Sequence, residues 1–186
     1  MKKRLLLLVI AAAGCGAQQD WMPLELGRTS HYSVSTEFGK YITEVKVSRQ
    51  VSIGSETGVA LTGPMGESHI GWKDGVLLVE RFPGARFSPP IPMLVDSRDR
   101  LRRNWKGTVQ GIWGSFQGTA TMDQGMVEEE IGGIKASALK SDLTIQNPSG
   151  KSIRVQTLFQ PGIGIAAQKH WLGGDLMVWI ERQSSS

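Results

Sequence analysis

The sequence lacks the features that define several protein classes, namely paired cysteines, a long apolar run and a regular glycine repeat. Each absence excludes one of those classes. One cysteine in 186 residues cannot form an intramolecular disulfide. The longest apolar run, Leu5 to Ala13, is too short for a transmembrane helix, which needs roughly 20 residues. The 23 glycines and eight prolines follow no fixed period, which excludes collagen and indicates a turn-rich fold. With 40% apolar and 20% charged residues, the chain can build a core.

The net charge of +4 does not indicate a nucleic-acid-binding protein. Three of the cations, Lys2, Lys3 and Arg4, precede the apolar run, in a segment that we expect to be removed. Without them, 18 basic residues stand against 17 acidic ones. Binding of DNA or RNA depends on clustered cations that neutralise phosphates, so we expect no nucleic-acid partner.

The amino terminus has the parts of an export signal. A cationic start is followed by the apolar run and then by small residues. Ala12-Ala13-Gly14-Cys15 resembles the lipobox of bacterial lipoproteins, in which small residues precede an obligatory cysteine. In that family the signal is cleaved before the cysteine, and the cysteine thiol carries a diacylglycerol. The resemblance implies a lipoprotein signal peptide over residues 1–14, lipidation of Cys15 and a membrane anchor.

This segment leaves an alternative open. The leucine that usually lies three residues before the cysteine is Ala12 here, and ordinary cleavage after Ala17 also fits the small residues. Gly16 follows the cysteine, where an aspartate would retain a lipoprotein in the inner membrane of enteric-type bacteria. By resemblance, we expect a location in the cell envelope, in the outer membrane and facing the periplasm.

The rest of the chain is long enough for one domain. Residues 15–20 are predicted to be a lipidated tether, 21–182 a single β domain and 183–186 a polar tail. The dominant period in the domain is two, which is typical of strands with one buried face. In one such run, alternation places the following residues on one face: Tyr41, Thr43, Val45 and Val47.

Turn signals separate the apolar runs. Asp74-Gly75 favours a hairpin, so we expect Ser68–Trp72 to pair with Val76–Phe82. Pro83 to Pro92 holds four prolines and is predicted to be an irregular excursion between sheet halves. The runs recur about every 8–12 residues, without a sustained helical period. The predicted fold is all-β and largely antiparallel, a curved sheet, open barrel or sandwich of about 9–11 strands.

Three short elements resemble those of secreted bacterial β-sheet proteins. They are Trp21 to Gly27, Glu129 to Ala136, which is an acidic strand running into a glycine turn, and Gln160 to Ile165. Together they are similar to the uncharacterised DUF3108-like group and, more distantly, to curved-sheet lipoprotein carriers of the LolA type. The resemblance implies a periplasm-facing sheet without known catalysis.

No motif predicts an active site, a cofactor or a metal centre. Gly162-x-Gly164-x-x-Ala167 formally fits a dinucleotide fingerprint, but the residues after it cannot form the helix that would meet a pyrophosphate. The three histidines, His31, His69 and His170, are too widely spaced to indicate a zinc site. We interpret them as surface or core histidines and expect no cofactor.

One charge cluster is a candidate binding patch for an anionic partner. Arginine binds phosphate well because its guanidinium donates two parallel hydrogen bonds. The alternative is a solvated loop that is partly neutralised by Asp96 and Asp99. The patch comprises Arg98, Arg100, Arg102, Arg103, Trp105 and Lys106.

The sequence therefore predicts a non-enzymatic envelope lipoprotein. We expect its sheet to offer a surface or a cavity to an apolar ligand, a lipid or another envelope protein. A carrier would have room inside the sheet, whereas a structural or assembly protein would have a filled core and an exposed apolar patch. An exported hydrolase with a loop-built site is the competing class, and it would need a histidine in reach of a serine and a carboxylate.

Overall fold

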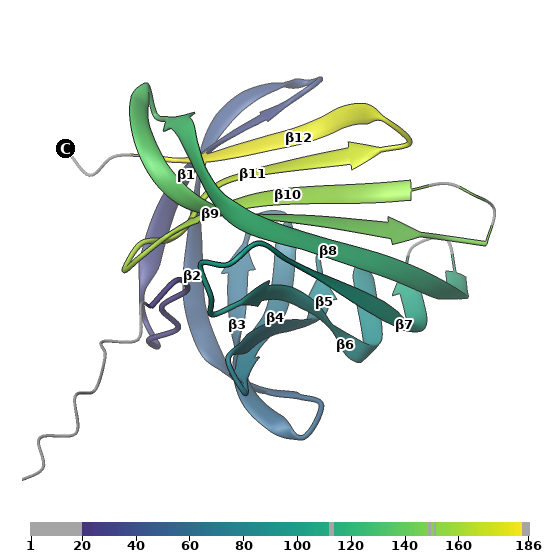
Figure 1. Cartoon of the computed structure of the whole chain (residues 1–186). Coiled ribbons are helices and arrows are strands. Elements are labelled where there is room, and N and C mark those ends of the chain that lie inside the picture. Colours follow the sequence, from purple (N-terminus) through teal and green to yellow (C-terminus); the bar gives the residue numbers. More distant parts are fainter. Residues whose placement is uncertain (1–19, 112–113, 149, 151, 184–186) are drawn as a thin grey trace, which may run out of the picture.

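The computed structural model describes residues 20–111, 114–148, 150 and 152–183. Twelve antiparallel strands form a closed barrel in which each strand pairs with its neighbours in sequence, and β12 returns to pair with β1 (Figure 1). The strands are β1 (Thr29–Thr36), β2 (Gly39–Ile53), β3 (Glu56–Gly63), β4 (Gly66–Lys73), β5 (Val76–Phe82), β6 (Ala85–Val95), β7 (Leu101–Gly111), β8 (Gly114–Ile131), β9 (Ile134–Gln146), β10 (Ser152–Gln160), β11 (Gly164–Leu172) and β12 (Asp175–Arg182). The described part of the chain holds no helical segment of the length and hydropathy that a membrane span requires.

The all-β, antiparallel fold class predicted from the sequence is confirmed. The sheet closes completely and has twelve strands, against the 9–11 expected. The predicted hairpin is also confirmed, since β4 pairs with β5 around a turn in which Asp74 and Gly75 have φ values of 49° and 72°. Only left-handed backbone closes so short a hairpin, and Gly75 adopts it without strain.

The proline-rich segment was wrongly predicted to be irregular, because most of it forms β6. β6 pairs with β7 only between Ala85–Ser88 and Thr108–Gly111. Beyond Ser88 it carries Pro89, Pro90 and Pro92 and leaves the β7 ladder. Proline lacks an N–H group and is therefore tolerated where a strand has no neighbour to bond on that side.

Side chains replace the ladder where β6 leaves β7. The indole of Trp105 donates to the Pro89 carbonyl at 3.0 Å. The Gln124 amide accepts from the Val95 N–H at 2.8 Å and donates to the carbonyls of Val95 and Ser97 at 3.0 and 2.7 Å. Gln124 is only 4% exposed, so these bonds link the end of β6 to β8 from inside the fold and satisfy the side-chain amide itself.

The core fills much of the barrel interior, mainly between β5 and β10. Phe87 packs edge-on against both Phe82 and Trp105, with ring centroids 5.9 and 6.0 Å apart. Interdigitated side chains of this kind leave little room for a ligand in that half. Fully buried members of the core include Val79, Phe87, Ile91, Met122, Leu139 and Phe159.

One close approach requires glycine. A Cβ atom on Gly58 of β3 would lie 2.4 Å from both the Ile70 carbonyl oxygen and a side-chain carbon of Ile53. Ile53 itself is 1% exposed. Glycine at position 58 therefore lets β3 and β4 bend tightly around the end of β2.

Candidate ligand cavity

The barrel encloses a cavity of about 140 Å³ beside the filled core. Its walls come chiefly from the inward faces of β1, β2, β3 and β11, and most of the lining is aliphatic. Thr43, Val45 and Val47 all line it, so the face that alternation predicted for this strand is the inward one. Apolar lining residues include Val34, Val45, Leu61, Ile70, Ile165 and Ile180.

A short chain of polar side chains crosses the β11 wall. Gln168 donates from Nε2 to the Thr157 hydroxyl at 2.9 Å, which leaves its Oε1 facing His170 Nε2 at 2.8 Å. This arrangement assigns the ring proton to Nε2 of His170. From β1, which is two strands away in the barrel, the Tyr32 hydroxyl donates to the Ile165 carbonyl of β11 at 3.2 Å. Such groups can orient a ligand that the apolar walls hold.

Burial keeps these groups uncharged. Removal from water lowers the pKa of His170 from 6.5 to about 4, and it raises the pKa of the Tyr32 phenol. Both side chains are therefore neutral at pH 7. The nearby guanidinium of Arg28 is turned to Glu25, at 3.4 Å, and to the Gly162 carbonyl. A cavity with this lining suits an uncharged apolar group.

The size of the cavity limits what can enter. Pockets for drug-sized ligands usually measure about 300–1,000 Å³, whereas a cavity of about 150 Å³ holds a molecule such as benzene. Met65 and Ile163 line the cavity and are 42% and 37% exposed, so it reaches the surface at the β3–β4 and β10–β11 turns. The space fits a small ligand, or one end of a larger one.

The first described residues pack against one end of the barrel. The Gly162 N–H donates to the Asp20 carbonyl at 2.7 Å, and the Trp72 indole donates to the Met22 carbonyl at 3.2 Å. Trp21 is 2% exposed, and Met22 and Pro23 line the cavity. The resemblance element that begins at Trp21 is therefore part of the cavity wall.

The predicted anionic-partner patch does not form one surface. Arg102 pairs with Asp123 at 2.6 Å, and Lys106 shares the outward face of β7 with it. Arg103 and Trp105 lie on the opposite face of the strand, where the Trp105 ring is buried against Phe87. Arg98 and Arg100 precede β7 and are exposed. Cys15, the predicted lipidation site, lies outside the described residues.

The three histidines occupy separate places. His31 faces Glu44 at 3.5 Å, His69 bonds Glu67 at 2.5 Å and is near Arg49, and His170 bonds Gln168. Among the described residues, none of the three is paired with both a carboxylate and a serine, and no cluster could hold a metal ion.

A second feature is an exposed apolar patch at the β1–β2 and β11–β12 hairpins. Phe38 is 91% exposed and Ile42 is 70% exposed. Trp179 pairs with Ser35 of β1, is 40% exposed and lies under the Lys169 ammonium at 5.1 Å. Two further members are Leu176 and Met177.

Comparisons with known proteins identify the fold. No family model matches the chain, and no curated protein matches it. A candidate lipoprotein from Parabacteroides distasonis has a similar structure, with a TM-score of 0.50 and 10% identity over 87% of this chain and 96% of that one. The hypothetical lipoprotein YmcC from Escherichia coli scores 0.44, with 10% identity over 84% of each chain. A candidate exported protein with a YmcC-like fold from Bacteroides fragilis scores 0.39, with 13% identity over 87% and 96%. The first likeness shows the fold alone, and the two lower scores support no further statement.

Proposed function

We propose that the chain is an exported envelope lipoprotein whose barrel binds a small, uncharged apolar ligand, or the apolar group of a partner, without catalysing a reaction. The cavity carries this proposal. Its walls are mainly aliphatic, and Tyr32 and His170 are held neutral beside them. A few fixed polar groups in an apolar space are what a binding site for such a ligand needs.

The anchor rests on a different observation. Cys15 is the only cysteine of the chain and stands directly behind the small residues of the lipobox-like segment. A protein of the same fold is itself a candidate lipoprotein. Acyl chains contribute about 0.8 kcal/mol for each buried CH₂ group, so several of them would hold the barrel at the membrane. The location that follows is the cell envelope, in the outer membrane and facing the periplasm.

Native mass spectrometry of the full protein, purified from its own envelope, tests the cavity. We expect a co-purifying apolar molecule on the wild type and none on Val45→Phe, whose ring would occupy the cavity. Thr119→Phe is the matched control, because Thr119 is exposed on the outside of β8. An empty wild-type protein, or equal loading of both variants, would refute ligand binding in the barrel.

A second candidate function is supported by the apolar patch at Phe38, Ile42 and Trp179. Exposed aromatic and aliphatic residues gathered on one surface often mark a protein interface. On this reading, the barrel is an assembly module that docks onto another envelope protein. Phe38→Ser together with Ile42→Ser would then lose a co-purifying protein that Val45→Phe retains.

A further inference from the structure

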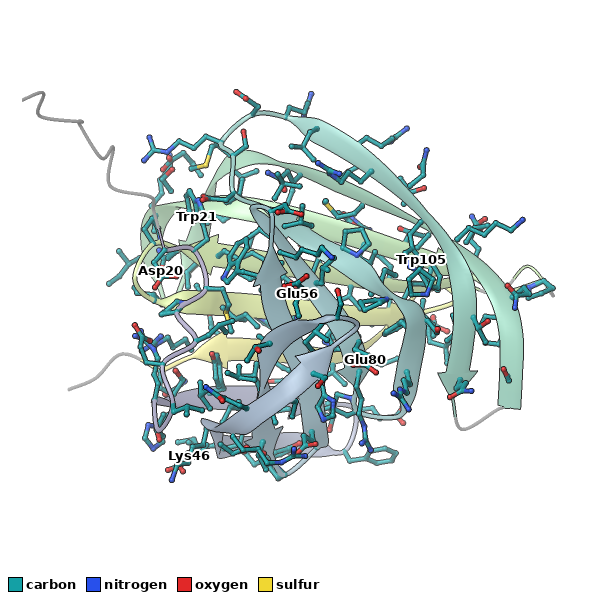
Figure 2. The ribbon with its side chains drawn as sticks, turned by 90° about the horizontal axis from the view of Figure 1, so that it is seen from below. Asp20, Trp21, Lys46, Glu56, Glu80 and Trp105 are labelled. Atoms are coloured by element: carbon teal, nitrogen blue, oxygen red, sulfur yellow. The ribbon has the colours of Figure 1, made fainter. Side chains whose placement is uncertain are left out.

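The described fold begins where a membrane anchor would end. Asp20 is fixed by the Gly162 N–H, and Trp21 is buried. Asp20 lies five residues beyond Cys15 in the chain. Because an extended chain spans at most about 3.5 Å per residue, a lipid on Cys15 would hold Asp20 within about 18 Å of the bilayer. The surface around Asp20 is thus the surface that a bilayer would meet first (Figure 2).

That surface has two exposed apolar side chains. Ile163 follows Gly162, the residue that binds Asp20, and is 37% exposed. Leu26 is 55% exposed and lies two residues before Arg28, which bonds the same turn. Aliphatic side chains in such positions can enter the boundary between headgroups and acyl chains.

Two guanidinium groups flank Ile163. Arg28 donates to the Gly162 carbonyl, and Arg182 donates to the Ile163 carbonyl at 2.7 Å. Each bond uses a fraction of the five N–H donors of an arginine, so donors remain for lipid phosphates. The exposed Lys46 lies on the same side of the barrel as Asp20 (Figure 2).

The carboxylates of this end offset part of that charge. Glu25 is paired with Arg28 at 3.4 Å. The pKa of Asp20 is raised, first by burial and then by the nearby charge of Glu25, with a smaller effect from Asp96. Contact with a membrane here would rest on the apolar side chains, with the arginines favouring anionic lipid.

The apolar patch at Phe38 lies away from this end. β1 begins at Thr29, beside the Arg28 contact, and ends at Thr36, before the Phe38 turn. At about 3.3 Å per residue, β1 spans roughly 25 Å between the two ends. A barrel held by Asp20 therefore has two distinct apolar surfaces, and only the first adjoins the tether.

We propose that the barrel end formed by Asp20, Leu26 and Ile163 rests on a phospholipid surface, with Arg28 and Arg182 bound to lipid phosphates. The inference rests on the lipid anchor of the proposed function. Since Ile163 also lines the cavity, this orientation opens the cavity towards the bilayer. An apolar ligand can then pass from the membrane into the barrel without crossing water.

Single labelled cysteines test the orientation. Acylation consumes the Cys15 thiol, so an introduced cysteine is the only free one in the lipidated full-length protein. Ile163→Cys, Phe38→Cys and Lys106→Cys would each carry an environment-sensitive dye, in vesicles of phosphatidylethanolamine and phosphatidylglycerol with a headgroup spin label. We expect quenching at residue 163 to be several-fold stronger than at 38 or 106. Vesicles of phosphatidylcholine alone should reduce the quenching at 163.

Equal quenching at the three positions, or the strongest quenching at 38 or 106, would overturn the orientation. The intact mass of each preparation separates this failure from that of the anchor. A protein without acyl groups would refute the anchor, and the orientation with it. An acylated protein whose Ile163→Cys label is quenched no more strongly than its Phe38→Cys label would refute the orientation alone.

Discussion

His170 should make the stability of the barrel fall as the pH drops below 7. Its pKa is lowered from 6.5 to about 4 because the ring is removed from water. A base whose pKa is depressed in the folded state is protonated first in the unfolded chain. The contribution of the neutral His170 to the free energy of unfolding is therefore fully present above pH 6.5, and it is lost as the pH falls from there towards 4.

The shift sets the size of the effect. A difference of about 2.5 pKa units corresponds to about 3 kcal/mol when each unit is worth about 1.4 kcal/mol. Linkage places about 2 kcal/mol of this loss between pH 7 and pH 5, and the rest near pH 4. A domain of this size has a stability of only about 5–15 kcal/mol, so the loss is readily measured.

Urea denaturation of the full chain at pH 7, 6, 5 and 4 measures the effect when the wild type is compared with His170→Gln. The amide has no charge to gain and can still donate to Gln168 Oε1. Carboxylates whose pKa values are lowered by ion pairs, such as Asp123 beside Arg102, also lose stability in acid, but they do so equally in both proteins. From pH 7 to pH 4, we expect the free energy of unfolding of the wild type to fall by about 3 kcal/mol more than that of His170→Gln. Parallel curves would show that His170 does not titrate with folding.

Three further variants, one of them a triple substitution, test the fold and the candidate sites. Gln124→Ala removes the amide that bonds the Val95 N–H and the Ser97 carbonyl, while the Val95 carbonyl keeps the Ser97 N–H, and it should cost about 2 kcal/mol in urea denaturation. The exposed Gln117→Ala should cost less than about 0.5 kcal/mol, and equal costs would contradict the role of Gln124. Gly58→Ala forces a Cβ against the Ile70 carbonyl and should lower the free energy of unfolding by about 3 kcal/mol or more. Gly125→Ala, whose Cβ would have its nearest contact at 3.8 Å, should be tolerated. A Gly58→Ala variant as stable as the wild type would contradict the close approach. If the predicted patch binds an anionic partner, a triple variant should bind anionic polysaccharide more weakly than the wild-type full protein in a pull-down; the variant combines Arg100→Ala, Arg102→Ala and Arg103→Ala. Unchanged binding would refute the patch.

The fold class could be predicted from the sequence because the alternation of apolar and polar residues in a strand is a local signal. Alternation from Tyr41 to Val47 predicted which residues share a face of the strand, and Asp74-Gly75 located a hairpin. The closure of the barrel could not be predicted, because it depends on the pairing of β1 with β12, for example of Tyr32 with Arg182. No local sequence pattern indicates a contact between residues so far apart in the chain. β6 was missed because proline predicts an irregular segment unless the strand is known to leave its ladder.

The candidate site was less predictable than the fold. The histidines carried no spacing that indicates a role, and the sequence does not show that His170 faces inward. Its direction depends on the irregularity near Ala166, where the register of β10 and β11 shifts between Leu158 and Phe159. Trp105 was grouped with the arginines by sequence position, although its indole bonds Pro89 in the core. The cavity itself arises from side chains of strands at both ends of the chain.

The intact mass of the protein purified from its own envelope tests the central claim most directly. The account predicts a chain that begins at Cys15 and carries the added mass of a diacylglycerol and an amino-terminal acyl group. A chain that begins at Gln18 without acyl mass would contradict it and leave a freely diffusing exported barrel.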